Sequence, residues 1–246
     1  MQHKKNIALI TGANKGLGFE TARELGKTGW TVLLGARNAE LGRAAESKLR
    51  AEKVDARFIE LDVTEHNTIT SAADSIRAEL GRLDALINNA GIIDKQDGPP
   101  SAASPEVIER ILRTNFTGTI KVTQTMLPLL KKSGKGRIVN VSSGLGSITL
   151  HGDPNWEYAP FKLIGYCASK AALNMFTVQL AFELKAHGIA VNSVNPGYTA
   201  TDLNANQGNQ TVAEGAAEIV RVALQETSET GRFYETGGAL PWQGKI

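Results

Sequence analysis

Short apolar runs alternate with longer amphipathic stretches along most of the chain. The runs at residues 7–10, 31–36, 58–61 and 84–87 have the length and continuous hydrophobicity of strands that are buried on both faces. Between them, apolar residues recur at helical spacing. Because strands that alternate with helices in this way pair in parallel, the pattern predicts an α/β fold whose sheet is covered by helices on both faces.

The alternation continues in the second half of the chain. A strand is predicted from Arg137 to a pair of serines, and further strands are predicted at 189–194 and 231–236. No internal repeat or linker interrupts the pattern. We therefore expect a single domain, with a cofactor-binding half at 5–135 and a catalytic and substrate-binding half at 136–246.

Two of the predicted helices are longer than the others. One begins at Ser104, a capping residue followed by proline, and reaches Lys132. It contains Asn115, a mediocre helix former, whose position suggests a function; a polar residue turned to solvent is the alternative. The other helix is predicted from Tyr166 to Ala186.

The first apolar run continues directly into a glycine-rich turn at residues 11–18, which leads into a helical pattern. Glycine allows a sharp turn and a close approach of the backbone to a ligand. The N-terminus of the following helix offers unpaired N–H groups to a phosphate. Strand, glycine turn and helix together predict a dinucleotide site, with a tight turn that binds nothing as the alternative.

Two basic residues bear on the choice of dinucleotide. The second predicted strand ends at Arg37 with no acidic residue, and Lys15 lies within the glycine turn. An acid at this point would suit the ribose 2′-hydroxyl of NAD(H), whereas arginine suits the 2′-phosphate of NADP(H). The pair therefore favours NADP(H), although either residue alone could be a solvated charge. Asp62, after the third strand, could cap the next helix or reach the adenine.

Tyr166 and Lys170 are one turn apart on the same face of the second long helix. A phenol beside an ammonium, facing a serine hydroxyl from the preceding strand, is suited to proton transfer. The ammonium favours the phenolate and so lowers the pKa of the tyrosine. The serine can donate a hydrogen bond to a substrate carbonyl oxygen as negative charge develops there.

Composition narrows the possible partners. The 27 Lys and Arg residues against 25 Asp and Glu residues give a net charge of +2 without clustering, so no nucleic acid is expected. The single cysteine, Cys167, excludes an internal disulfide and fits a reducing compartment. The four histidines have no ligand spacing, so no metal site is expected. Neither a secretion signal nor a membrane-spanning run is recognisable, so we expect a cytoplasmic protein without membrane contact.

Together these residues resemble the short-chain dehydrogenase/reductase family over nearly the whole chain. The matching motifs, in the family's order, are Thr-Gly-x-x-x-Gly-x-Gly at 11–18, Asn-Asn-Ala-Gly at 88–91, Asn115, Ser143, Tyr-x-x-x-Lys at 166–170 and Pro-Gly at 196–197. The resemblance implies a Rossmann-type doubly wound sheet of about seven parallel strands. Lys15 and Arg37 are most similar to the NADPH-dependent carbonyl reductase branch.

The resemblance also implies roles for individual residues. Tyr166 would exchange a proton with the carbonyl oxygen, which Ser143, the second serine of its pair, would orient. Lys170 would hydrogen-bond the nicotinamide ribose and lower the pKa of Tyr166, and Asn115 would hold a water in a proton relay. The cofactor-binding residues expected on this basis are Gly12, Asn14, Lys15, Gly16, Leu17, Gly18, Arg37, Asp62, Val63, Asn89, Ala90, Gly91, Tyr166, Lys170, Pro196, Gly197 and Thr199.

The segment between Ser143 and Tyr166 is longer than is usual in the family. Its prolines and bulky side chains suggest one wall of the substrate pocket, with a surface cover or a subunit contact as the alternative. The substrate-binding residues expected are Leu145, Trp156, Tyr158, Phe161, Tyr198 and Leu203. A homo-oligomer, either a dimer or a tetramer, is compatible with the resemblance, and so is a monomer.

These observations predict an oxidoreductase that uses NADPH to reduce the carbonyl of a small-molecule ketone or aldehyde to an alcohol. One alternative is an NAD-linked alcohol or hydroxysteroid-type dehydrogenase, which Arg37 disfavours. Another is a non-catalytic protein that senses the dinucleotide, which the presence of Asn115, Ser143, Tyr166 and Lys170 disfavours.

Overall fold

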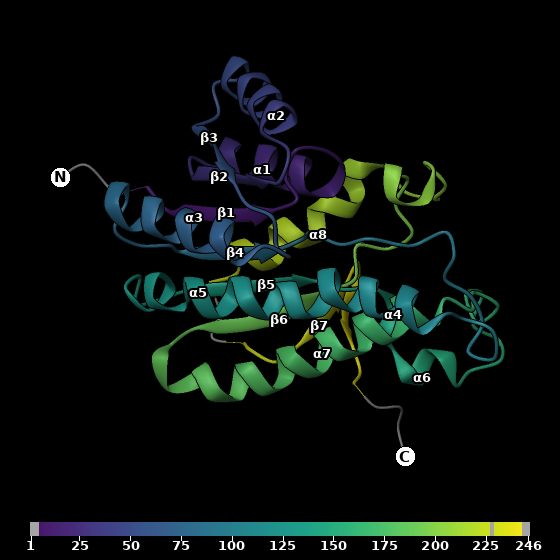
Figure 1. The fold of residues 1–246 in the computed structure, drawn as a ribbon. Coiled ribbons are helices and arrows are strands. Elements are labelled where there is room, and N and C mark those ends of the chain that lie inside the picture. Colours follow the sequence, from purple (N-terminus) through teal and green to yellow (C-terminus); the bar gives the residue numbers. More distant parts are fainter. Residues whose placement is uncertain (1–4, 227–228, 243–246) are drawn as a thin grey trace.

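An eight-stranded sheet forms the centre of the computed structural model, which describes residues 5–226 and 229–242 (Figure 1). Its strand order is β3-β2-β1-β4-β5-β6-β7-β8. The strands are β1 (Ile7–Thr11), β2 (Thr31–Ala36), β3 (Ala56–Glu60), β4 (Ala85–Asn88), β5 (Arg137–Val141), β6 (Ala190–Val194), β7 (Phe233–Glu235) and β8 (Gly238–Leu240). Strands β1 to β7 pair in parallel. This confirms the predicted doubly wound α/β fold in a single domain.

The short edge strand β8 was not predicted. It pairs antiparallel with β7 through a turn in which Gly237 and Gly238 have positive φ angles of 100° and 149°. Those angles are accessible to glycine and rarely to other residues, so the glycine pair makes the reversal possible. Because β8 has only three residues and stays largely exposed, it leaves no apolar run in the sequence.

Helices cover both faces of the sheet (Figure 1). One face carries α3, α5 and α7, and the other carries α1, α2 and α8. Their bounds, with those of the remaining helices, are α1 (Gly16–Lys27), α2 (Ala39–Ala51), α3 (His66–Glu79), α4 (Pro105–Leu112), α5 (Thr119–Lys131), α6 (Ile148–His151), α7 (Ile164–Leu184) and α8 (Val212–Leu224). Short 3₁₀ turns occur at Gly144–Gly146, Lys185–His187 and Asp202–Asn204.

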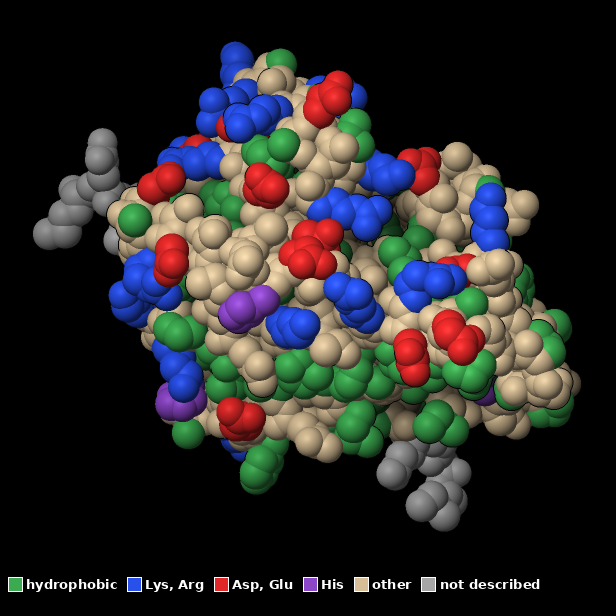
Figure 2. Space-filling model, in the orientation of Figure 1, with side chains coloured by type: hydrophobic (Ala, Val, Ile, Leu, Met, Phe, Trp, Pro, Cys, Tyr) green, Lys and Arg blue, Asp and Glu red, His purple; other side chains and the backbone are tan. Residues whose placement is uncertain are grey.

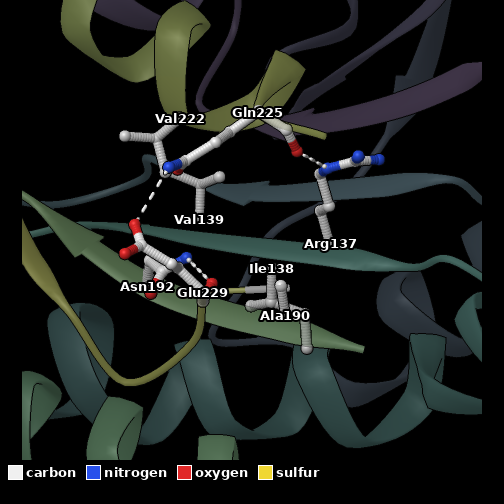
Figure 3. Close-up of a pocket in the computed structure, with 8 residues that line it drawn as sticks. All are labelled: Arg137, Ile138, Val139, Ala190, Asn192, Val222, Gln225 and Glu229. Atoms are coloured by element: carbon white, nitrogen blue, oxygen red, sulfur yellow. Dashed lines mark hydrogen bonds between the residues drawn. The ribbon is translucent and has the colours of Figure 1, made fainter. Parts of the chain in front are cut away.

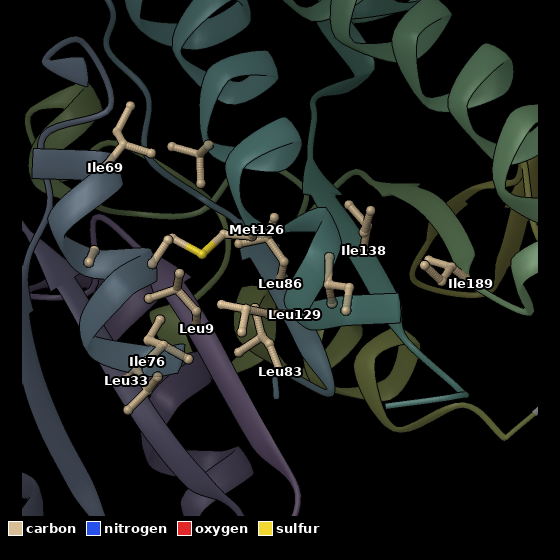
Figure 4. Packing of buried hydrophobic residues seen from close by; sticks show 14 of the residues in the cluster. Leu9, Leu33, Ile69, Ile76, Leu83, Leu86, Met126, Leu129, Ile138 and Ile189 are labelled. Carbon is tan, nitrogen blue, oxygen red and sulfur yellow. The ribbon is translucent and has the colours of Figure 1, made fainter. Parts of the chain in front are cut away.

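The continuous apolar strands divide their side chains between two cores. In β1, Ile7 and Leu9 belong to the core under α3, α5 and α7, whereas Ala8 and Ile10 belong to the opposite core. This division follows from the alternation of side chains along a strand. Figure 4 shows Leu9 meeting Met126 of α5 in the first of these cores. The sheet is therefore rigidly held from both sides, and its strand ends present a stable edge.

The helix predicted to run unbroken from Ser104 to Lys132 is interrupted. Between α4 and α5 the backbone forms a six-residue π-helical segment, Arg113–Gly118, that contains Asn115. Such segments are rare and concentrate at functional sites. Gly118, at the end of this segment, packs closely against the loop after β3. A Cβ on Gly118 would lie 2.8 Å from the carbonyl oxygen of Val63, so a larger residue would not fit there.

Candidate active site

The glycine turn joins the end of β1 to the start of α1. Gly12 and Gly16 adopt positive φ angles of 65° and 57°. A Cβ on Gly18 would lie 2.5 Å from Asn89 Nδ2 and 2.6 Å from the Gly12 carbonyl oxygen, so this position requires glycine. No side chain caps the start of α1, and its first turn carries no acidic residue. The turn and the helix N-terminus therefore fit the phosphates of a dinucleotide.

The loop after β4 is hydrogen-bonded to this turn. Asn89 donates from its amide nitrogen to the carbonyl oxygens of Thr11 (2.9 Å) and Gly12 (3.2 Å). The Thr11 hydroxyl accepts from the backbone N–H groups of Asn89 and Ala90, both at 3.0 Å. The Asn-Asn-Ala-Gly motif thus fixes the shape of the glycine turn through its own hydrogen bonds.

Tyr166, Ser143 and Lys170 come together at the carboxyl end of β5. Tyr166 and Lys170 are 7% and 4% exposed, and the Ser143 side chain is close enough to the Tyr166 phenol to offset part of the rise that burial causes in its pKa. Ser143 begins the 3₁₀ turn after β5, where its hydroxyl accepts from Leu145 N at 3.2 Å. Lys170 Nζ donates to the carbonyl oxygen of Val141 at 2.8 Å. The sequence prediction that these three side chains meet is consistent with this geometry.

The predicted lowering of the Tyr166 pKa is wrong for this geometry. Burial raises the pKa of Tyr166 to about 12, and the neighbouring Ser143 side chain offsets only part of that rise. Lys170 Nζ lies 5.6 Å from the centroid of the tyrosine ring. It donates its hydrogen bond to the carbonyl oxygen of Val141 and not to the Tyr166 hydroxyl. Burial also lowers the pKa of Lys170 to about 8. Desolvation therefore dominates the pKa of both groups.

Asn115 lies behind this group of residues and is not turned to solvent. It is 1% exposed, accepts from Ile92 N at 2.8 Å and donates to Ile92 O at 3.0 Å. Its amide also donates to Ser169 Oγ at 3.1 Å. A Cβ on Gly91 would lie 3.4 Å from Asn115 Oδ1 and 3.7 Å from Lys170 Nζ, so the structure brings Asn115, Gly91 and Lys170 side by side.

Ser169 was missed at the sequence level. Its hydroxyl donates to the carbonyl oxygen of Tyr166 at 2.7 Å while accepting from Asn115. It thereby joins the π-helical segment to the helix that carries Tyr166 and Lys170. Ser169 lies between Tyr166 and Lys170 on a helix, where serine is not a favoured residue. That position was the available sign of a specific role.

The basic residues near the expected cofactor site have different surroundings. Arg37 is exposed directly after β2. Lys15 forms an ion pair with Asp202, with 2.8 Å between Nζ and Oδ2, and the lysine holds the pKa of that carboxyl below its usual range. The pair links the glycine turn to the segment after β6. Of the two, Lys15 is engaged in an ion pair and Arg37 is open to solvent.

Asp62 does not cap α3. It accepts from the backbone N–H and the hydroxyl of Thr64, at 2.9 and 2.7 Å, and so forms a turn before the helix. The N-cap position belongs to Glu65, whose side chain makes no capping bond. Val63, in the same turn, is buried. Asp62 shapes the loop at the edge of the sheet, beside the end of β2.

The segment after β6 is held at the same edge of the sheet by its own hydrogen bonds and by packing against α8. Thr199 is buried, and its hydroxyl donates to the Pro196 carbonyl oxygen at 3.1 Å while its N–H donates to Gly197 O at 3.0 Å. A Cβ on Gly215 of α8 would lie 2.3 Å from Thr199 Oγ1 and 2.9 Å from Leu17. Leu17 of α1 and Thr199 of this segment, both expected at the cofactor site, therefore pack against the same residue of α8.

Four of the expected substrate residues form a cluster of aromatic rings. Ring centroids are 5.6 Å apart for Trp156 and Tyr158, 6.0 Å for Tyr158 and Phe161, and 5.8 Å for Tyr158 and Tyr198. A Cβ on Gly144 would lie 3.4 Å from Trp156, so the cluster reaches the residue that follows Ser143. We call Trp156, Tyr158, Phe161 and Tyr198 the aromatic cluster.

The two remaining substrate candidates lie outside the aromatic cluster in different ways. Leu145 joins it indirectly, because its carbonyl oxygen is 3.1 Å from Nε2 of His151, whose ring packs edge-on against Trp156. Leu203 is exposed on the 3₁₀ turn after β6. The structure thus brings most of the predicted substrate residues together beside Ser143.

A hydrogen-bonded hollow occurs at the opposite edge of the sheet, where β5 and β6 begin (Figure 3). There Arg137 Nε donates to Gln225 O at 2.7 Å and Asn192 Nδ2 donates to Glu229 O at 3.0 Å. These polar contacts join β5 and β6 to the chain after α8. The hollow is separate from the residues around Tyr166.

Two further findings concern residues 5–226 and 229–242. No group of three or more His, Cys, Asp or Glu side chains is arranged to hold a metal ion there. In the same ranges, no helix combines the length and the apolar character that crossing a membrane requires.

Comparison with known proteins identifies the family. The family model for short chain dehydrogenase matches residues 6–212. The chain therefore belongs to the short-chain dehydrogenases and is an oxidoreductase of that family. A short-chain dehydrogenase from Penicillium roqueforti (strain FM164), anuI, is 39% identical over 227 residues, covering 90% of this chain and 89% of that protein.

Two solved structures share the fold over almost their whole length. Salutaridine reductase from Papaver somniferum has a TM-score of 0.80 and 31% identity, covering 94% of this chain and 99% of that one. The NADPH-bound carbonyl reductase from chicken fatty liver has a TM-score of 0.85 and 27% identity, covering 98% and 100%. Both are reductases by name, and the second was solved with NADPH.

Proposed function

We propose that this protein uses NADPH to reduce the carbonyl of a ketone or aldehyde, with Tyr166 as proton donor. The observation that carries the proposal is the buried Tyr166 phenol, whose pKa burial raises and the neighbouring Ser143 side chain in part lowers, with the buried ammonium of Lys170 beside its ring. These groups lie at the edge of the sheet where the glycine turn and the uncapped start of α1 fit a dinucleotide. The NADPH-bound carbonyl reductase with the same fold supports it.

The proposed cofactor site uses residues that follow the ends of five strands, β1, β2, β3, β4 and β6. The glycine turn and the start of α1 would hold the pyrophosphate, and Arg37 would meet the 2′-phosphate of NADPH. Asp62 and Val63 would border the adenine, and Ala90 and Gly91 the ribose. Pro196 to Thr199 would frame the nicotinamide. When bound, NADPH supplies the hydride for the carbonyl carbon, and the protein supplies alignment and charge.

The protein's own groups would manage the proton. Because the pKa of Tyr166 is about 12, its phenol keeps its proton at neutral pH and is ready to donate it to the carbonyl oxygen. The Ser143 hydroxyl would donate a hydrogen bond to the same oxygen as charge develops. Lys170, within a turn of Tyr166, would stabilise the phenolate left behind, and Asn115 would hold a water that returns a proton to the group.

The aromatic cluster supports an apolar substrate. Its rings join the segment before α7 to Tyr198 in the segment after β6 and reach Gly144, beside Ser143. A carbonyl compound with a ring or a long apolar portion would pack against these side chains while its polar oxygen faces Tyr166. The aromatic cluster would therefore bind the apolar part of the substrate, and Tyr166 would bind its carbonyl oxygen.

The first test is loss of NADPH absorbance over a panel of ketones, aldehydes and diketones. We expect turnover by the wild-type protein and a loss of about 1,000-fold or more in kcat for Tyr166→Phe, because removing a proton donor acts on the transition state. NADPH affinity should change by less than about twofold. Tyr234→Phe removes a hydroxyl from a buried tyrosine of β7 and serves as control. Retained turnover in Tyr166→Phe would contradict the assignment.

A second test concerns the dinucleotide. We expect Arg37→Asp to lower the ratio of kcat/KM with NADPH to that with NADH by about 100-fold, since the carboxylate repels the 2′-phosphate and suits the 2′-hydroxyl. The same assay measures it. Arg43→Asp, which changes a neighbouring arginine that packs over Phe58, is the charge-matched control. An unchanged ratio in Arg37→Asp would show that another residue reads the ribose.

We further propose that two copies of the chain associate through the outer face of α7. Met175, Val178 and Phe182 recur at helical spacing and are exposed, with Phe182 at 85%. Residues 171–182 contain no charged side chain, so this face does not repel an identical copy. Figure 2 shows hydrophobic side chains gathered over α5 and α7, while charged side chains cover the region around α2. An exposed apolar face of this kind marks an interface.

A further inference from the structure

The N-terminus of α7 is capped by a residue from a distant part of the chain. Leu163, at the N-cap position, has no side chain able to accept a hydrogen bond. Instead the loop after β4 supplies the acceptors. Asp97 Oδ1 accepts from Gly165 N at 3.0 Å, and Asp97 Oδ2 accepts from Tyr166 N at 2.9 Å. The Gly98 carbonyl oxygen accepts from Ile164 N at 3.0 Å.

The carboxylate is held closely in this position. Asp97 is 9% exposed, and its Oδ1 also accepts from Gly98 N at 2.9 Å. A Cβ on Gly165 would lie 3.3 Å from both carboxylate oxygens and 2.9 Å from Ile111 Cδ1. Glycine at this position therefore allows Asp97 to approach the helix. Both oxygens are used, and neither contacts Ser143 or Lys170 in any hydrogen bond of the described residues.

The loop that carries Asp97 begins at the expected cofactor site. It follows Gly91, which borders both Asn115 and Lys170. Asn89, two residues earlier, is fastened to the glycine turn, and Ile92 is bound to Asn115. The loop thus runs from the proposed dinucleotide site to the backbone of Tyr166 within a few residues. Its far end is the cap on α7.

We propose that Asp97 is a positioning residue that sets the place of the Tyr166 hydroxyl by binding the backbone N–H of Tyr166 itself. The inference rests on the proposed function, in which Tyr166 donates the proton. The two carboxylate oxygens of Asp97, together with the carbonyl oxygen of Gly98, fix the first turn of α7. Because the capped N–H belongs to Tyr166, a shift of the cap moves the phenol directly.

The rest of α7 does not depend on Asp97. Leu173, Leu180 and Leu184 are buried, and the last two belong to the core shared with α5 and β6. Loss of the cap is therefore expected to loosen the first turn while the helix stays docked. A displacement of about 1 Å at a reacting group costs up to about 100-fold in rate, so a kinetic effect should exceed the effect on substrate affinity.

The experiment compares three variants with a matched control. Asp97→Ala removes both acceptors, and Asp97→Asn leaves one oxygen and turns an amide nitrogen toward an N–H donor. Gly165→Ala leaves the carboxylate intact and forces it outward. The control is Asp94→Asn, a carboxylate three residues earlier that pairs with Arg110 instead. It removes the same charge from the same loop without touching α7.

For Asp97→Ala we expect kcat to fall by about 10- to 100-fold. KM and NADPH affinity should change by less than about threefold, with smaller kcat losses in Asp97→Asn and Gly165→Ala. Asp94→Asn should keep wild-type kcat. NMR of ¹³C-labelled tyrosine, assigned with Tyr166→Phe, should show a lower Tyr166 pKa in Asp97→Ala than in the wild type. Loss of the negative carboxylate and entry of water both favour the phenolate.

The outcomes are decisive in either direction. A wild-type kcat and an unchanged Tyr166 resonance in Asp97→Ala would overturn the inference, as would an equal loss in Asp94→Asn. A lower melting temperature with wild-type kcat would show that Asp97 only stabilises the helix, which also overturns it. If the wild-type protein reduced no carbonyl, the proposed function would fail, and the tyrosine titration would still decide whether Asp97 positions Tyr166.

Discussion

Lys170 holds an ammonium group in the interior of the protein. It is 4% exposed and, among the described residues, its hydrogen-bond partner is the carbonyl oxygen of Val141. Burial lowers its pKa from 10.5 to about 8. At neutral pH the folded chain therefore carries an incompletely solvated charge, which destabilises the fold while serving the site.

We expect Lys170→Met to be more stable than the wild type at pH 7. A pKa of about 8 in the folded chain against 10.5 in the unfolded chain corresponds to roughly 3 kcal/mol, of which the lost hydrogen bond to Val141 removes about 1. The gain should thus be on the order of 2 kcal/mol in the free energy of unfolding, measured by urea denaturation. Lys185→Met, at an exposed lysine after α7, should show no gain.

The sign of the pH dependence follows from the two pKa values. Below pH 8 both folded and unfolded chains carry the charge, and the penalty on the fold is complete. Between about pH 8 and 10.5 the unfolded chain binds more protons, so wild-type stability rises with pH relative to Lys170→Met. The difference should be lost above pH 10.5. A constant difference between the two proteins across this range would contradict the burial argument.

At the residue scale, motif spacing predicted which side chains meet and did not predict their acidity. Tyr166 and Lys170 are one turn apart in any helix, so their proximity follows from sequence alone. Their pKa values depend on how much water reaches them and on where the ammonium points. Those depend on Val141 and on packing contributed by distant segments. Asp97 was missed for the same reason, because it is 69 residues away from Tyr166 along the chain.

At the scale of elements, the outer face of α7 gives a direct test of association. We expect Phe182→Glu, alone or with Met175→Glu, to convert a dimer into a monomer in light scattering after size exclusion. A buried carboxylate without a partner costs several kcal/mol in an apolar interface. Leu41→Glu places the same charge at an exposed leucine of α2 and should leave the mass unchanged. A monomeric wild-type protein at micromolar concentration would refute the proposed interface.

The π-helical segment shows the limit of periodicity within one element. Apolar spacing on both sides of Asn115 is helical, so the sequence predicted one helix where the structure has α4, the segment Arg113–Gly118 and α5. The local widening places the Asn115 amide against Ile92 and Ser169. Ile92 lies in the loop after β4, and Ser169 lies on α7. The low helix propensity of asparagine indicated from the sequence that Asn115 is unusual in a helix. Its hydrogen-bond partners depend on the tertiary structure and could not be predicted from the sequence.

At the scale of the whole molecule, the parallel sheet was predictable because its signal is repeated. Each strand of the first half is a short apolar run followed by a polar signature at its carboxyl end, and such ends meet at one edge in a doubly wound sheet. β8 and the cap on α7 carry no repeated signal. One depends on a glycine turn, and the other on a single aspartate in a loop.

The place of β1 in the interior of the sheet, between β2 and β4, affects how the chain is assembled during synthesis. Strands β1, β2 and β3 leave the ribosome first and pair with one another. The other edge of β1 stays open until β4 emerges, and every later strand adds on that same side (Figure 1). A nascent chain that ends before residue 85 therefore exposes an apolar sheet edge, the kind of surface that chaperones recognise. From β4 onward assembly proceeds in one direction, and Tyr166, which follows β5 in the chain, receives its cap only after the first five strands have been synthesised.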